Sequence, residues 1–234
     1  QTQWQRFCDL LWYHDDLGLW LDVSRMHLNS AALETLTPRL EDAFKAMENL
    51  EGGAIANADE QRQVGHYWLR QPQLAPDPQV GASISAEIDA IDQFGKSILS
   101  GSIQAPNGKP FTDVLWIGIG GSALGPLLMV RALQDHQAGL PFHFFDNVDP
   151  NGMSRVLAGL GERLCTTLVI TVSKSGGTPE PHLGMEQARH RLEASGGSWP
   201  GQAVVVTMAG SKLDQQAEKE NWLQRFDMFD WIGG

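Results

Sequence analysis

The sequence has little cysteine, with Cys8 and Cys165 the only two in 234 residues. Neither lies in a CxxC motif, and the seven histidines form no HExxH pair, so neither a disulfide framework nor a zinc site is supported. We therefore expect no metal. Long apolar runs are also missing, since none approaches the roughly 18 residues of a membrane span, and no signal-peptide pattern opens the chain. These features predict a cytoplasmic protein that does not bind membranes.

Positive charge is scarce as well. Lys and Arg number 17 against 28 Asp and Glu, which gives a formal net charge of −11. Because neutralisation of phosphates dominates nucleic-acid affinity, an acidic chain without a basic tract is not expected to bind nucleic acid. Any anionic ligand must be held by a local arrangement of donors rather than by the overall field. The hydrophobic share of 42% is enough for a substantial core, and 25 glycines suit a fold with many tight turns.

Residues 1–110 are predicted to form a helical N-terminal segment. Apolar residues from Trp4 to His14 follow helical spacing. Thr37 can cap a helix that has Pro38 in its first turn and ends at Gly52-Gly53. A further helix is expected over Ser85–Leu99, an extended segment over 17–24, and a proline-rich loop over 71–79.

The sequence pattern is different over residues 111–234, where short β-rich runs alternate with helical segments. Near-continuous apolar strands indicate burial on both faces, as in a parallel sheet covered by helices. The fold class is therefore α/β, a flavodoxin-like doubly wound sheet preceded by the helical segment. Helices are expected to begin near Ser122, Asn151, Thr178 and Ser211. The expected strands are Asp113–Ile119, Phe142–Asn147, Thr167–Val172, Ala203–Met208 and Phe226–Trp231.

The first chemical motif is a glycine-rich loop, Gly118-Ile-Gly-Gly-Ser122-Ala123, which follows a strand and opens a helix. Glycines let the backbone approach a ligand, and a helix N-terminus presents unpaired N–H groups to an anion. The loop also fits the dinucleotide pattern GxGxxA, with Asp146 at the end of the next strand as a candidate ribose ligand. Alone, this loop does not distinguish a phosphate-binding site from the dinucleotide-binding site of a nicotinamide-dependent oxidoreductase.

The second motif is Ser173-Lys174-Ser175-Gly-Gly-Thr178-Pro-Glu180, again between a strand and a helix. It places three hydroxyl groups, one ammonium group and two glycines within six residues, and these groups donate to phosphate oxygens. A dinucleotide site has no need for this second cradle, and a P-loop is excluded because GxxxxGK[ST] is absent. Loops that follow parallel strands meet at one sheet edge. The pair therefore predicts one shared phosphate site.

Together the motifs resemble the sugar-isomerase (SIS) phosphosugar-binding fold and, more widely, the glucose-6-phosphate isomerase family, particularly its bacterial and cyanobacterial members. The matching pieces cover most of the chain. They are Gly65–Arg70, IGIGGSALGP at 117–126, Asp146–Pro150, TVSKSGGTPE at 171–180, Thr207–Leu213 and Asp230–Gly234.

The resemblance implies phosphate-binding roles for Gly121, Ser122, Ser173, Lys174, Ser175 and Thr178, and a supporting position near the site for Glu180. It implies an aldose–ketose isomerase that acts on glucose 6-phosphate and fructose 6-phosphate through an enediol, without a cofactor, as a homodimer. Residues 111–234 would be the first of two SIS domains. The family's catalytic glutamate, ring-opening histidine and proton-relay lysine have no counterpart here. We therefore expect an N-terminal fragment with no catalytic residue of its own. A non-catalytic phosphosugar sensor stays an alternative.

Overall fold

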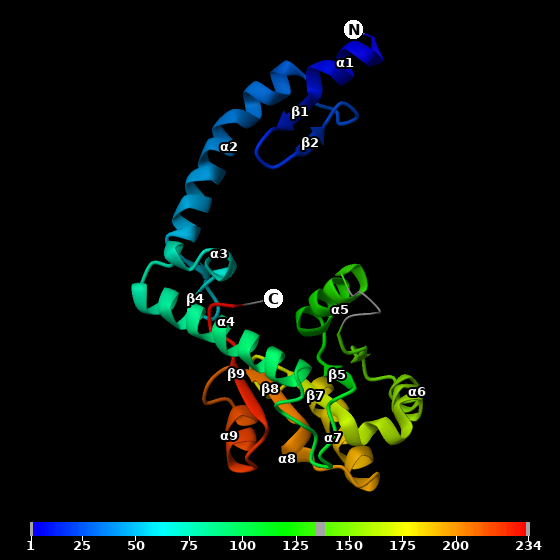
Figure 1. Ribbon diagram of the computed structural model, residues 1–234. Coiled ribbons are helices and arrows are strands. Elements are labelled where there is room, and N and C mark those ends of the chain that lie inside the picture. The colour runs from blue at the N-terminus through cyan, green and yellow to red at the C-terminus, as the bar shows by residue number, and fades with distance from the viewer. Residues whose placement is uncertain (1, 134–138, 233–234) are drawn as a thin grey trace. The chain divides into compact units, whose positions relative to one another are not determined.

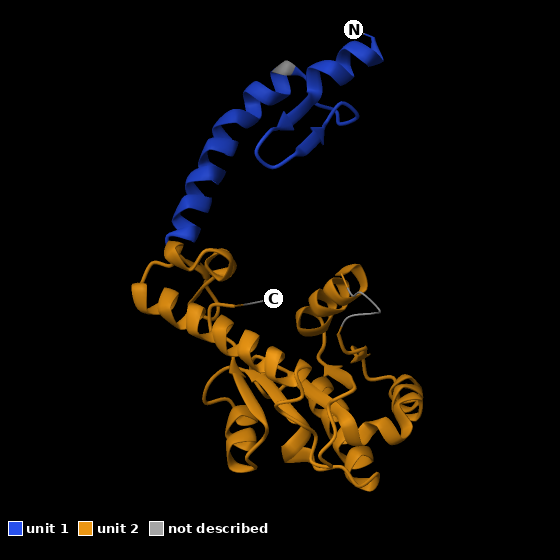
Figure 2. Cartoon of the chain, in the orientation of Figure 1, with its two compact units in different colours: residues 1–52 blue, residues 53–234 orange. Residues whose placement is uncertain are grey.

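The computed structural model describes residues 2–133 and 139–232. The chain forms two compact units, 1–52 and 53–234, which Figure 2 distinguishes by colour. The helices and strands between residues 53 and 110 therefore belong to the same unit as the large sheet. The assignment of residues 1–110 to a separate segment stays a prediction. Gly233 and Gly234 of the terminal motif lie outside the described residues.

The first unit contains two helices and a hairpin. Helix α1, Gln3–Leu10, starts with a capping box in which the Thr2 hydroxyl accepts from the Gln5 backbone N–H and the Gln5 side chain accepts in return. Strands β1, Leu11–His14, and β2, Leu19–Asp22, pair antiparallel. Helix α2 then runs over Ser30–Glu51, capped by Asn29 and ended at Gly52. Its predicted end at Gly52 is confirmed.

Two expectations for this unit are wrong. Leu11 and His14 lie in β1 opposite Asp22 and Leu19, because ladder hydrogen bonds override their helical spacing. Helix α2 also starts before Thr37, whose hydroxyl donates to the Leu33 carbonyl at 2.9 Å instead of capping. Pro38 is thus inside the helix rather than in its first turn. The Asn29 side chain, which accepts from the Ala32 N–H, is the cap that sets the earlier start.

The second unit is an α/β sandwich built on a five-stranded parallel sheet (Figure 1). Its strands are β5 Asp113–Ile117, β6 Phe142–Phe145, β7 Thr167–Val172, β8 Ala203–Thr207 and β9 Gln224–Asp227. A short hairpin precedes them, made of β3 Ile55–Asn57 and β4 Arg62–Gln63. The helices are α3 His66–Arg70, η1 Pro72–Leu74, α4 Pro78–Leu99, α5 Gly121–Leu133, α6 Pro150–Leu160, η2 Gly161–Thr166, α7 Pro179–Ala194, α8 Trp199–Gln202 and α9 Lys212–Lys219.

The strand order is β6-β5-β7-β8-β9. From β5 the chain moves outward to β6 and then returns to β7 on the other side of β5, so the order reverses between β5 and β7. Ile117 at the end of β5 lies opposite Thr171 in β7, so these two strands end at nearly the same height. In parallel sheets the crevice at such a reversal is where ligands bind.

Alternating strand residues build two cores. Leu115, Val169 and Val205 face one side, where they pack with residues of α6, α7, α8 and α9. Leu168 and Val204 face the other side, where α4 supplies Ile98 and Phe94. The strands are therefore buried on both faces, as their continuous apolar runs predict. None of the helices in residues 2–133 and 139–232 combines the length and the apolar character needed to cross a membrane.

Several predicted bounds in this unit are wrong. Helix α4 begins at Pro78 rather than Ser85, because Asp77 caps it and accepts from the Gln79 N–H at 2.8 Å. The region 71–79 therefore contains η1 and the first turn of α4. The last strand is shifted to Gln224–Asp227, since its ladder partners are Val204–Thr207 of β8. The other sheet strands fall within their predicted ranges, and β7 matches its range at both ends.

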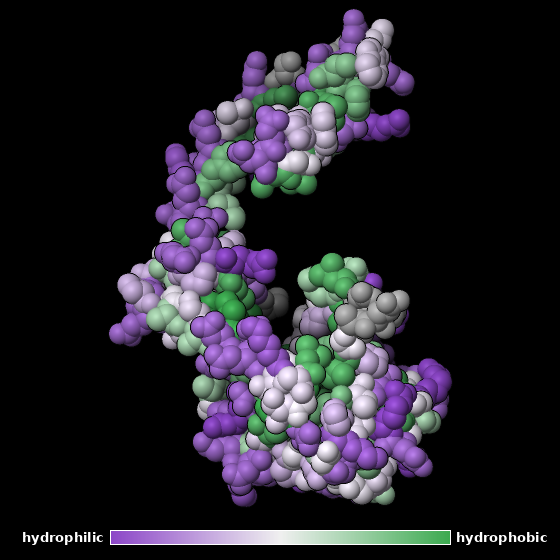
Figure 3. Space-filling model, in the orientation of Figure 1, coloured by the Kyte–Doolittle hydropathy of each residue, from purple (hydrophilic) through white to green (hydrophobic). Residues whose placement is uncertain are grey.

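The sheet face beneath α4 is not closed along its whole length. An apolar cavity of about 710 Å³ lies between α4, the sheet and α5. Helix α5 adds hydrophobic side chains that are more than half exposed, and Figure 3 shows green residues gathered there. They are Leu124, Leu128, Met129 and Leu133.

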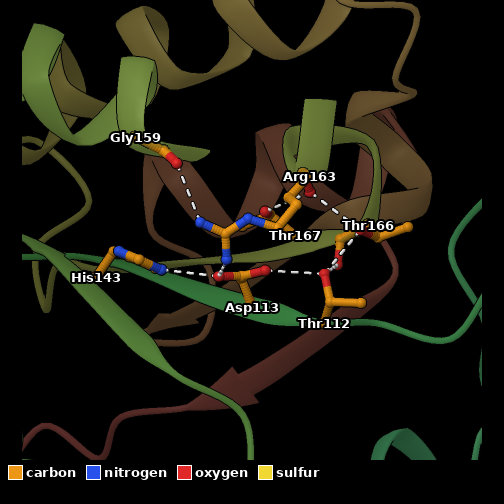
Figure 4. A network of polar contacts seen from close by, with 7 residues as sticks. All are labelled: Thr112, Asp113, His143, Gly159, Arg163, Thr166 and Thr167. Carbon is orange, nitrogen blue, oxygen red and sulfur yellow. Dashed lines mark hydrogen bonds and ion pairs between the residues drawn. The ribbon is translucent and has the colours of Figure 1, made fainter. Parts of the chain in front are cut away.

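A polar cluster holds the amino ends of the strands together (Figure 4). Asp113, the first residue of β5, is fully buried and accepts from Arg163 Nη1 at 2.5 Å and from the Thr112 hydroxyl at 2.8 Å. His143 Nε2 of β6 lies 2.8 Å from the same carboxylate. Because a buried carboxylate is tolerated only when it is paired, these partners offset the cost of burying Asp113. It lies at the sheet edge opposite the carboxyl ends of the strands.

Candidate functional site

A cavity of about 530 Å³ lies at the carboxyl ends of β5, β7 and β8. Five predicted phosphate-binding residues line it together, namely Ser122, Ser173, Lys174, Ser175 and Thr178. They come from two loops that are 51 residues apart when counted from Ser122 to Ser173. The loops meet because β5 and β7 are neighbours in register, and this is the crevice at which the strand order reverses.

The first loop connects β5 to α5. A Cβ at Gly118 would stand 2.7 Å from the Ser122 carbonyl oxygen, so only glycine allows this close turn. The indole of Trp116 donates to that same carbonyl at 2.8 Å, which fixes the backbone at Ser122. Gly121 is the first residue of α5 and lies next to Ser122, but it does not line the cavity.

The second loop continues the sheet beyond its strands. The N–H of Ser173 donates to Val206 at 3.1 Å, and the N–H of Met208 donates to the Lys174 carbonyl at 3.1 Å. The Thr207 hydroxyl donates to the Ser173 carbonyl at 2.6 Å. Gly176 has a left-handed φ of 64°. The loop backbone is thus held rigidly before any ligand arrives, which reduces the ordering entropy that binding must overcome.

The hydroxyl groups of this loop are available as donors. Ser173 is only 5% exposed, and its Oγ has no hydrogen-bond partner among the residues that the structure describes. Thr178 is the N-cap of α7 but its side chain makes no capping hydrogen bond, and its hydroxyl lies 3.4 Å from that of Ser175. A buried hydroxyl without a partner is unfavourable, and a helix N-terminus favours an anion. Both features suit a phosphate group in the cavity.

Lys174 brings positive charge to the cavity. Its ammonium group donates to the Asp230 carbonyl at 2.6 Å, which ties the loop to the segment after β9. Burial, and after it the positive charge of Arg62, lower the pKa of Lys174 below the ordinary lysine value, while Glu60 and Asp230 oppose the shift. An anion in the cavity would oppose this shift, because a nearby negative charge favours the charged form of Lys174.

The β3–β4 hairpin forms a wall of the cavity that sequence reasoning missed. Asn57, Glu60, Arg62 and His66 line it, although the motifs gave them no role. The signal in the sequence is the neighbouring segment Gly65–Arg70, which resembles the family but carries no phosphate-binding motif. Gly65 donates to the Trp231 carbonyl at 3.2 Å, and a Cβ there would overlap the Trp68 ring, so this wall is locked to the chain's last described residues.

Two further candidates lie outside the cavity. Glu180 is in the first turn of α7 but is not a lining residue, so its supporting role stays a prediction. Asp146, the candidate ribose ligand, accepts from the Asn147 side chain at 2.7 Å and does not line the cavity either. Over the described parts of the chain, no group of three or more His, Cys, Asp or Glu residues is placed to hold a metal ion.

Comparisons with known proteins find relatives of this chain. The family model described as phosphoglucose isomerase matches residues 22–234. The chain is 72% identical to a glucose-6-phosphate isomerase of Synechococcus sp. (strain CC9605) over 99% of its own length and 44% of that relative. It is 71% identical to the glucose-6-phosphate isomerase of Prochlorococcus marinus (strain MIT 9313), over 100% of its length and 42% of the relative.

A solved structure is similar as well. The crystal structure of a glucose-6-phosphate isomerase from Chlamydia trachomatis D/UW-3/Cx superposes with a TM-score of 0.82 at 28% sequence identity. The match covers 98% of this chain and 44% of the other. The chain thus spans less than half the length of these relatives.

Proposed function

Because the chain belongs to the phosphoglucose isomerase family, we propose that its cavity binds the phosphate group of a hexose phosphate. The observation that carries this proposal is the convergence of Ser122 with Ser173–Thr178 at one crevice. Each hydrogen bond to a charged group is worth about 1.5–3 kcal/mol, so several together can hold a dianion on a chain of net charge −11. No cofactor enters the proposal.

The protein of which this chain is a part would interconvert glucose 6-phosphate and fructose 6-phosphate. A carboxylate would take the proton from C2 and return it to C1, and it would come from the portion of the relatives that this chain does not span. The cavity's share of the work is to fix the remote phosphate, so that binding energy positions the reacting carbons. The phosphate-binding domain would occupy residues 111–234.

Two assays test this division of roles. The chain is expected to bind fructose 6-phosphate but to show no turnover in a coupled assay from which host isomerase is excluded. In a longer protein, Ser173→Ala combined with Thr178→Ala should weaken binding of phosphorylated sugars more than that of unphosphorylated analogues. Equal losses for both ligand classes would mean that the hydroxyls only shape the turn. Binding of NAD with protection of Asp146 would favour an oxidoreductase instead.

The same proposal includes a cytoplasmic homodimer that does not bind nucleic acid. The acidic composition supports the last point, because few phosphates could be neutralised. Light scattering on the longer protein would measure its mass directly, and a monomeric mass would contradict the dimer.

A further inference from the structure

A second cation, Arg62, lines the cavity from the β3–β4 hairpin. The Asn57 side chain accepts from the Glu60 N–H at 3.0 Å, and Gln61 adopts a left-handed φ of 53°. This tight turn places Glu60 and Arg62 on the cavity wall formed by the hairpin. Arg62 is held there by an ion pair of 3.0 Å between its Nη1 and Glu60 Oε2.

Arg62 is more enclosed than its partner, since its side chain is 29% exposed against 55% for Glu60. Its positive charge acts on Lys174, whose pKa is lowered first by burial and then by Arg62. Two like charges that share a partly buried cavity repel each other more strongly than they would in water. This repulsion disfavours the pair as it stands, and an anion that contacts both charges would offset it.

We propose that Arg62 is a second cationic contact for the phosphate group and selects dianionic sugar phosphates over uncharged sugars. This inference rests on the proposed function of the cavity. The guanidinium group can donate two parallel hydrogen bonds to phosphate oxygens, whereas Lys174, tied to the Asp230 carbonyl, acts as a point charge. Glu60 keeps the guanidinium group in place before the ligand arrives.

The test is a calorimetric titration of the chain with inorganic phosphate at an ionic strength of about 0.15 M, where distant surface charges are screened. Arg62→Gln should weaken phosphate binding by about tenfold or more, because at least one charge-assisted hydrogen bond is lost. Arg70→Gln is the matched control, because it removes the same charge from an exposed residue of α3 that does not line the cavity. The control should bind phosphate within about twofold of the unmodified chain, as expected for a screened distant charge.

A second readout uses Lys174. In the Arg62→Gln variant, the pKa of Lys174 should rise toward the ordinary lysine value, because one cause of its lowering is gone. An NMR titration that follows the ammonium signal of Lys174 measures this pKa. Should the glutamine variant not fold, Arg62→Lys decides: it keeps the charge but loses the planar fork, and about tenfold weaker binding is expected. An affinity unchanged by either Arg62 substitution overturns the inference.

The outcomes also separate this inference from the proposed function. Weaker binding in Ser173→Ala with unchanged binding in Arg62→Gln would leave the phosphate site intact and reject the role of Arg62. An unmodified chain that binds no phosphate would reject both.

Discussion

Replacing Ser173 with alanine is expected to stabilise the ligand-free chain and to weaken its binding of phosphate. The Ser173 side chain is buried, and its Oγ lacks a partner within the part of the chain that the structure describes. Such a hydroxyl carries a desolvation penalty of about 1–3 kcal/mol. Removing one oxygen atom leaves a small void that offsets part of this gain. We therefore expect a net gain of about 1 kcal/mol, or about 2–4 °C in Tm for a chain of this size.

Phosphate should shrink or reverse the difference in Tm between the variant and the unmodified chain. If the Ser173 hydroxyl donates to a bound phosphate, its loss removes about 1.5–3 kcal/mol of binding free energy, which corresponds to about 10-fold to 150-fold weaker affinity. Ligand stabilises the native state by an amount that depends on this affinity. Thermal unfolding, with and without phosphate, measures both effects in one experiment. The variant should melt higher without the ligand, and its margin should shrink or reverse as phosphate is added.

Thr171 supplies the matched control. It lies two residues earlier on β7, is 1% exposed, and its Oγ1 also has no partner among the described residues, but it does not line the cavity. Thr171→Val should raise Tm by a similar amount and leave phosphate affinity within about twofold, because only the desolvation penalty is removed. A Ser173→Ala chain that melts lower than the unmodified one and binds phosphate equally well would refute the reasoning.

Three further predictions test separate parts of the unit. Gly176→Ala should lower the free energy of unfolding by about 2 kcal/mol or more in urea unfolding, because its φ of 64° is left-handed and a Cβ would stand 2.8 Å from Ser211 Oγ. Gly177→Ala is the control: its Cβ would meet open space, so the free energy of unfolding should change by less than about 1 kcal/mol. Burial raises the pKa of Glu87; the hydrogen bond from the Asp227 backbone opposes this shift, and repulsion from the Asp227 charge adds to it. Stability therefore falls as pH rises from the ordinary glutamate value through that raised pKa, and Glu87→Gln should raise Tm at pH 7 but not at about pH 3.5. Asp113→Ala should lower the unfolding free energy by about 3 kcal/mol, since it removes three side-chain hydrogen bonds of about 1 kcal/mol each, and a loss below about 1 kcal/mol would contradict that role.

The sequence predicts secondary structure best where the apolar residues follow a single pattern. The strand at Thr167–Val172 matches its prediction at both ends, because a short apolar run flanked by polar residues leaves no competing structure. The N-terminal unit was harder. The spacing of Trp4 to His14 suits a helix, but the second half forms a hairpin strand whose partners lie several residues further on. Helical spacing says nothing about such pairing.

Part of the candidate site could likewise be predicted from the sequence and part could not. Both glycine-rich loops could be found from the sequence, because their glycines and hydroxyls are contiguous and follow strands. Arg62 could not be found from the sequence, because it lies 111 residues before Ser173 and reaches the cavity through a hairpin with only two residues in β4. Its contribution depends on the packing of Gly65 against Trp68 and the Trp231 carbonyl, which no local pattern encodes.

The continuation of the β7–β8 ladder into the second loop has a consequence for amide exchange. The N–H groups of Ser173 and Met208 are bonded across the strands just as those within the sheet are. Exchange with solvent deuterium at these two amides therefore requires the central strands to separate, and not merely a loop to fluctuate. A cradle built in this way stays formed until the sheet itself opens, so its protection from exchange should follow the global unfolding free energy.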